Sequence, residues 1–133
     1  MDKSLQCISA IICGCCGFLW GTFDGLLYAL IAFMIMDYIT GLISAYIRKE
    51  ISSATGFKGI AKKVFIMMLV AVGHILDTRV ICGGTVCRSA VIGFYIANEG
   101  ISILENCSKL GLPLPPKLVN ALEQIKKQGG KND

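Results

Sequence analysis

A few ionisable side chains interrupt long apolar segments, and they are the residues of this chain that could do chemistry. Asp37 lies at the centre of the run 26–47, which is long enough to cross the roughly 30 Å hydrocarbon layer of a membrane as a helix. A carboxylate at that depth costs about 2.5–3.5 kcal/mol on insertion scales, so it faces other helices or water. Glu99 and His74, the only histidine, stand in two further apolar segments. These groups indicate pairing between helices that act together inside a membrane.

The pattern of an active site is missing from the chain. One histidine builds neither a catalytic constellation nor a metal site, and no cysteine pair has metal-ligand spacing with it. No nucleophile–base motif, phosphate-binding glycine loop or nucleic-acid-binding patch is present. We therefore predict a protein that is not an enzyme, needs no cofactor or metal and has no nucleic-acid partner. His74 is interpreted as a packed or pH-sensitive helix residue.

The seven cysteines are an odd number, and four of them lie in the first apolar segment. Thiols in such a segment behave as small hydrophobes. Cys82 and Cys87 flank a four-residue loop and could close a disulfide if they faced an oxidising compartment. We favour the interpretation of two free thiols near a membrane interface.

Composition places the chain among membrane proteins. Hydrophobic residues make up 54% of its 133 residues and charged residues only 17%. We expect an all-α membrane protein with three to four transmembrane helices plus a short C-terminal amphipathic helix. The expected transmembrane domain covers 1–110, with spans at about 5–21, 26–47, 62–80 and 86–106.

Two stretches are expected outside the spans. Residues 50–58 are polar and predict a loop with candidate N-caps before the third helix. Residues 111–133 predict a cytoplasmic region with a proline-containing turn, an amphipathic helix over 117–127 and a basic tail. That helix suits the surface of the cytoplasmic leaflet, or else is solvated. Its apolar face consists of Leu118, Leu122 and Ile125.

Basic residues in the connections predict the orientation. Five cations between the second and third spans are accompanied by a single acid, and further lysines follow the fourth span. The positive-inside rule places these regions on the cytoplasmic side, and with four spans it places both termini of this multi-pass protein there. If the first segment does not span, the N-terminus lies outside and the rest is unchanged. The cytoplasmic basic residues that we single out are Arg48, Lys49, Lys62, Lys63, Lys126 and Lys127.

Polar and small residues fall on single faces of the expected helices. In lipid no hydrophobic force drives helices together, so such stripes are what lets them associate. The first span carries Ser9, Cys13, Gly17 and Gly21, and the second carries Asp37, Thr40, Gly41 and Ser44. The third carries Lys63, His74 and Asp77, and the fourth carries Arg88, Tyr95, Glu99, Ser102 and Asn106, with Asn98 beside Glu99.

Two interpretations of these stripes remain open. In the first, they line an aqueous pathway once copies of the chain assemble. In the second, they bond within one bundle, for example Asp37 or Glu99 with His74, Tyr38 or Tyr95. The residue types alone do not decide between them.

Four short segments in order resemble the phage holin family, which also includes clostridial toxin-secretion holins. The segments are Asp37-Tyr-Ile-Thr-Gly41, Gly56-Phe-Lys-Gly-Ile60 with Lys62-Lys63-Val64, Asn98-Glu99-Gly-Ile-Ser102-Ile-Leu-Glu105-Asn106 and Gly111-Leu-Pro113-Leu-Pro115. The similarity covers roughly residues 22–120. Asp77 also sits where that family tends to carry an acidic residue, whereas the cysteine-rich first 20 residues are the least family-like part.

The resemblance implies a protein that accumulates as a homo-oligomer in the cytoplasmic membrane of a bacterial host and there forms lesions. A cell-wall hydrolase (endolysin), or in the toxin-secretion case a toxin, would leave through them without necessarily touching the protein. We hypothesise that Asp37 and Glu99 bias the chain toward association and that Gly17, Gly21 and Gly41 allow close approach. The alternative is a small proton-coupled membrane transporter, which would confer drug resistance and not sudden lethality.

Overall fold

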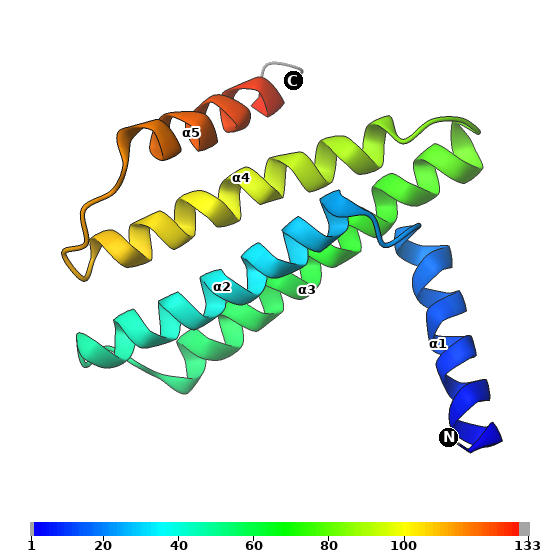
Figure 1. The fold of residues 1–133 in the computed structure, drawn as a ribbon, viewed down its shortest axis with the longest axis horizontal. Helices are drawn as coiled ribbons and strands as arrows, with labels where there is room; N and C mark the ends of the chain where they lie inside the picture. The colour runs from blue at the N-terminus through cyan, green and yellow to red at the C-terminus, as the bar shows by residue number, and fades with distance from the viewer. Residues whose placement is uncertain (1, 131–133) are drawn as a thin grey trace.

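The computed structural model describes residues 2–130, and within this range the regular structure is entirely helical. This confirms the all-α fold. The elements are α1 (Lys3–Trp20), α2 (Gly25–Ile47), α3 (Ser53–Ile75), the π-helical turn η1 (Leu76–Val80), α4 (Val86–Ser108) and α5 (Pro116–Gly130). Helices α2, α3 and α4 lie side by side as a bundle, α5 folds back along α4, and α1 leads away from the bundle (Figure 1).

Three helices of the described chain are long and apolar enough to cross a membrane, namely α1, α2 and the continuous helix Ser53–Val80. Helix α4 is not among them. It packs against α2, α3 and α5, so neighbouring helices cover much of its surface (Figure 1). A helix that is surrounded by protein can carry more polar residues than one that faces lipid.

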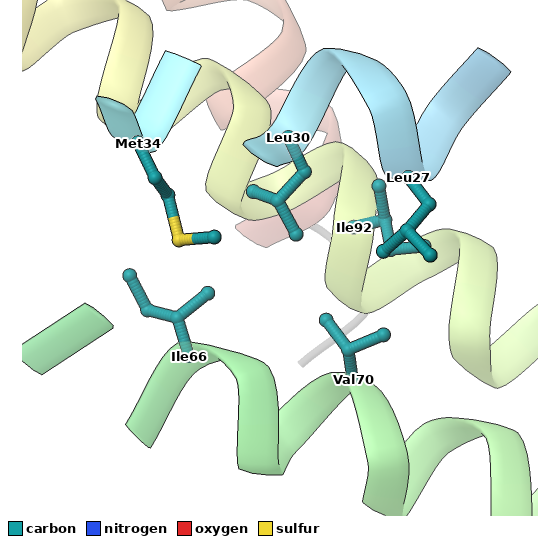
Figure 2. Packing of buried hydrophobic residues seen from close by; sticks show 6 residues of the cluster. All are labelled: Leu27, Leu30, Met34, Ile66, Val70 and Ile92. Carbon is teal, nitrogen blue, oxygen red and sulfur yellow. The ribbon is translucent and has the colours of Figure 1, made fainter. Parts of the chain in front are cut away.

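The apolar core lies where α2, α3 and α4 meet. Leu30, Val70 and Ile92 are fully inaccessible there, one from each helix (Figure 2). Leu27, Met34 and Ile66 complete the cluster. Large apolar side chains also cover the outside of α2 and α3, as at Ile35 and Phe65, and this exterior suits contact with lipid.

Helix α3 begins earlier than the sequence predicts. Ser52 is its N-cap, because its hydroxyl accepts a hydrogen bond from the Thr55 N–H at 3.2 Å. The polar stretch expected to be a loop over 50–58 is therefore helical from Ser53 onward, and the expectation was wrong there. Lys63 consequently lies about 15 Å along the helix, not at its start.

The small residues of helix α1 have no helix packed against them within the described chain. All residues from Lys3 to Phe18 are exposed, and a Cβ added at Gly17 would meet nothing within 4 Å. Cys13 is exposed as well. Gly21 lies beyond the helix as its C-cap, with a φ of 79° that favours glycine, so it does not extend the row of small residues on the helix.

Helix α5 forms as an amphipathic helix, but it packs on protein. Leu122 is its one buried residue among those whose burial is described, and a Cβ added at Gly100 of α4 would lie 3.0 Å from the Leu122 methyl groups. Leu118 and Ile125 remain 46% and 42% exposed. The helix thus lies beside α4 and packs on it through Leu122.

Candidate functional site

An ionic cluster lies between the three bundle helices. The ammonium of Lys63 on α3 donates to Asp37 Oδ2 of α2 at 2.7 Å and to Glu99 Oε2 of α4 at 2.8 Å. All three residues stand near the middle of their helices. Their side chains are 16%, 14% and 5% exposed in the order Lys63, Asp37, Glu99. One cation therefore ties two carboxylates together in the interior.

Asn106 of α4 extends this cluster toward the end of α2. Its amide nitrogen donates to Asp37 Oδ1 at 3.1 Å, to the Asp37 carbonyl at 3.2 Å and to Thr40 Oγ1 at 3.0 Å. Gly41 faces Asn106, and a Cβ there would make an ordinary van der Waals contact with the amide at 3.5 Å. The helices α2 and α4 are thus joined by polar bonds as well as by the apolar core.

The cluster is satisfied within one chain. Among the described residues, every buried side-chain nitrogen or oxygen has a hydrogen-bond partner. In this state the stripes bond inside the bundle, as the second interpretation holds, although with Lys63 and Asn106 and not with the histidine or tyrosines. The cluster contains two acids for one base, so it is stable only while Lys63 stays between them.

A polar cavity of about 250 Å³ leads from the cluster to the end of the bundle where α2 and α3 are joined. Asp37, Lys63 and Ser102 line its inner part, and Arg48 and Lys109 line the part next to the helix ends. The ionic cluster therefore has a polar connection to one end of the bundle, the end that the basic residues predict to be cytoplasmic.

A second cluster lies at the opposite end of the bundle, around Arg88. Its side chain, in a residue only 3% exposed, donates to the Trp20 carbonyl at 2.7 Å, to the Thr22 carbonyl at 2.9 Å and to Asp24 Oδ2 at 2.8 Å. Asp24 also caps α2 by accepting from the Leu27 N–H at 3.0 Å. Chiefly the hydrogen bond from Arg88, and then that N–H, hold the pKa of Asp24 below its ordinary value of 3.8.

Asp77 joins η1 to the start of α4. Its carboxylate accepts the backbone N–H groups of Cys87 at 3.0 Å and Arg88 at 2.8 Å, in the first turn of α4. It therefore caps α4 from another element, and the helix dipole favours a negative charge at that place. A Cβ added at Gly73 would lie 3.1 Å from the Arg88 backbone, so glycine lets α3 and α4 approach closely here.

The residues singled out from the sequence divide between the two clusters. Asp37, Thr40, Gly41, Glu99 and Ser102 gather around Lys63. His74 and Asp77 lie with Arg88 at the other end, where a Cβ at Gly21 would be 2.9 Å from the His74 ring. The expected face of Lys63, His74 and Asp77 thus belongs to two separate sites.

The remaining candidates lie outside these contacts. Ser44 is fully buried and accepts from Arg48 Nε at 3.3 Å, and Arg48 also pairs with Glu50. Asn98 is half-buried next to Glu99. Lys49, Lys62, Lys126 and Lys127 are exposed. Cys82 and Cys87, both within the described residues, are free thiols.

Sequence reasoning missed the roles of two cations. It placed Lys63 among the cytoplasmic basic residues at the start of the third span, whereas the residue lies inside the bundle because α3 starts at Ser53. It placed Arg88 on one stripe with Glu99, whereas its partners are the last residue of α1 and the connection 21–24. A lone arginine in an apolar segment is itself a signal of a buried partner, and Asp24 is the acid in the other connection that the charge pattern predicts on the same side of the membrane.

Fold and clusters together define a small helical membrane protein with two clusters of charged residues inside its bundle. The family model described as the bacteriophage holin family matches residues 14–127, and the chain belongs to this family. No solved structure matches the chain.

Three relatives show the range of similarity. An uncharacterized protein of Clostridium acetobutylicum is 41% identical over 109 residues, covering 82% of this chain and 87% of its own. An uncharacterized protein of Halalkalibacterium halodurans is 37% identical over 130 residues, covering 95% and 96%. A probable holin of Bacillus phage phi105 is 36% identical over 91 residues, covering 68% and 67%.

Proposed function

We propose that this protein is a holin of a bacterial cytoplasmic membrane, where copies associate into lesions that release a cell-wall hydrolase or a toxin. Membership of the holin family and the similarity to a phage protein described as a probable holin support this function. The observation that carries the mechanism is the cluster of Lys63 with Asp37 and Glu99, inside a bundle whose outside is apolar.

The single chain corresponds to a closed form. Its buried charges pair with one another, so the middle of the bundle presents apolar side chains to lipid and leaves the membrane intact. Separation of the helices would expose two carboxylates and one ammonium, and each is costly in hydrocarbon. Such an open bundle is stable only if several copies turn their charged faces toward a shared water-filled space. That water-filled space is the lesion.

Opening depends on crowding of copies in the membrane or on loss of the membrane potential. In the open form Asp37, Thr40 and Ser44 of α2, with Glu99 and Ser102 of α4, face the water of the lesion. The hydrolase waits in the cytoplasm and needs no contact with the protein. The positive-inside rule favours that side for the end of the bundle where α2 and α3 are joined, next to Arg48 and Lys49.

The proposal is tested by induced expression in a bacterium that also makes a cytoplasmic endolysin. A potential-sensitive dye and the turbidity of the culture report depolarisation and lysis. We expect an abrupt loss of potential followed by lysis, with lysis absent when the endolysin is omitted. Asp37→Leu should shift the time of lysis at equal expression, whereas Ile43→Leu, which changes an exposed α2 residue outside the apolar groove, should leave it unchanged.

Two results would contradict the proposal. Cells that keep their potential and viability would exclude a lesion, and drug resistance in such cells would favour the transporter. Identical lysis times for the Asp37→Leu variant and the parent chain would exclude the cluster from timing.

A further inference from the structure

An open apolar groove of about 790 Å³ runs between α2 and α3 on the side where α1 leaves the bundle. Ile31 and Ile35 of α2 and Val64 and Met68 of α3 are among its lining residues. The end of α1 also lines it, through Leu19 and Trp20. The structure thus contains a long apolar surface that its own helices leave uncovered.

Helix α1 is the matching unpaired element. It has 18 residues, is apolar enough to span a membrane, and has none of its residues buried. Its glycines have open surroundings, since a Cβ at Gly14 or Gly17 would meet nothing within 4 Å. Small residues make few van der Waals contacts with lipid, whereas a neighbouring helix can approach them closely and pack against their backbone.

The connection to α2 holds α1 away from the groove of its own chain. Buried Arg88 binds the carbonyls of Trp20 and Thr22 and the carboxylate of Asp24, which together span that connection. The Trp20 indole donates to the Met67 carbonyl at 2.9 Å and fixes the end of α1 at the groove. From there α1 points away from the bundle (Figure 1). Most of α1 therefore lies away from the groove of its own chain, and both surfaces are open to other molecules.

We propose that α1 of one copy docks in the α2–α3 groove of a second copy. Within each chain Leu19 and Trp20 already line one end of the groove, and the docked helix extends this apolar contact along the rest of it. This inference rests on the proposed function and identifies the contact between copies. The two surfaces are different, so the interface is heterologous: each copy offers a helix to one neighbour and a groove to the other. Contacts of this kind close into rings or grow into open chains, and they do not stop at a dimer.

Cysteine cross-linking in membranes tests this arrangement, with the other cysteines replaced. One chain keeps only Cys13 on α1, and a second carries only Met68→Cys in the groove. A third chain carries both. Phe65→Cys is the matched control, because Phe65 is an exposed residue of α3 that does not line the groove. A parallel set that keeps Cys16 in place of Cys13 tests another direction of the α1 surface.

A short bis-maleimide should convert the chain with both cysteines into a ladder of dimers, trimers and larger species. Mixing the two single-cysteine chains should give dimers and nothing larger. The ladder should be lost when Phe65→Cys replaces Met68→Cys. These three results together support the proposal.

Three other results would overturn it. An internally linked monomer would place α1 in its own groove, and dimers of the chain with Cys13 alone would indicate a symmetric contact between two α1 helices. Absence of a ladder in both sets would indicate that the groove is covered by lipid and not by α1 of a second copy. Endolysin release, measured in the same cells, separates this from the proposed function: release without a ladder refutes only the interface, and a ladder without release refutes only the lesion.

Discussion

Removal of Lys63 should destabilise the bundle far more than removal of either acid that it binds. Lys63→Met keeps the length of the side chain but leaves Asp37 and Glu99 facing each other without a cation. Breaking a buried pair by removing one partner costs about 3–5 kcal/mol, because an uncompensated charge stays buried. With side chains at most 16% exposed, solvent screens little of this cost.

Glu99→Gln is the informative comparison. It leaves one cation with one carboxylate, Lys63 and Asp37 at 2.7 Å, and its amide oxygen can still accept from the ammonium. We expect it to cost about 1 kcal/mol, the typical net value of one hydrogen bond. Lys62→Met is the matched control, since it makes the same change at the next, exposed residue and should stay within about 0.5 kcal/mol of the parent.

The measurement is unfolding of the purified protein in mixed micelles by SDS titration. Trp20 is the only tryptophan and its indole binds α3, so its fluorescence reports separation of α1 from the bundle, while circular dichroism reports loss of helix. Equal free energies of unfolding for Lys63→Met and Lys62→Met would refute the claim that Lys63 is needed to neutralise the two buried carboxylates. The same claim would be refuted if Glu99→Gln lowered the free energy of unfolding as much as Lys63→Met.

Two further predictions concern the opposite end of the bundle and the close helix contacts. Arg88 holds the pKa of Asp24 below 3.8, so this pair stabilises the fold above that pH, and the contribution is lost as the pH falls through the lowered pKa. When unfolding is measured at decreasing pH, the free energy of unfolding should therefore fall more steeply for the parent than for Asp24→Asn. Gly73→Ala should cost about 1–3 kcal/mol, because its Cβ would press on backbone at 3.1 Å, whereas Gly14→Ala meets nothing and should cost nothing in the same assay. Equal values for the two glycines would contradict the helix spacing.

Helical periodicity and the cost of buried charge predict much of this fold. The all-helical architecture, the long second helix with Asp37 at its centre and a helix after the proline turn all follow from local sequence. The start of α3 does not, because Ser53, Thr55 and Gly56 are weak helix formers whose helical state depends on the Ser52 cap and on packing against Tyr38.

The partners within the clusters were less accessible to sequence reasoning. A misplaced helix start moved Lys63 by about 15 Å, from the middle of the bundle to its edge, and hid the cation of the central cluster. Arg88 binds main-chain carbonyls at the end of α1 and in the connection that follows it, and the type of a residue does not indicate that its carbonyl will accept a hydrogen bond. The stripe on α2 was recognisable, but which helix faced it depended on the arrangement of the whole bundle.

The most direct test of the account is the exposure of the α2 stripe to water before and after lesion formation. Ser44→Cys, in a chain without other cysteines, places a thiol at a fully buried position of the stripe, and Ile43→Cys places one on the outward face next to it. N-ethylmaleimide crosses membranes but reacts quickly only with a hydrated thiol. The account predicts that Ser44→Cys is protected until lysis is triggered and then reacts, while Ile43→Cys stays protected in lipid throughout. A Ser44→Cys thiol that remains unreactive after the endolysin has escaped, or that reacts equally before the trigger, would contradict a lesion lined by this stripe.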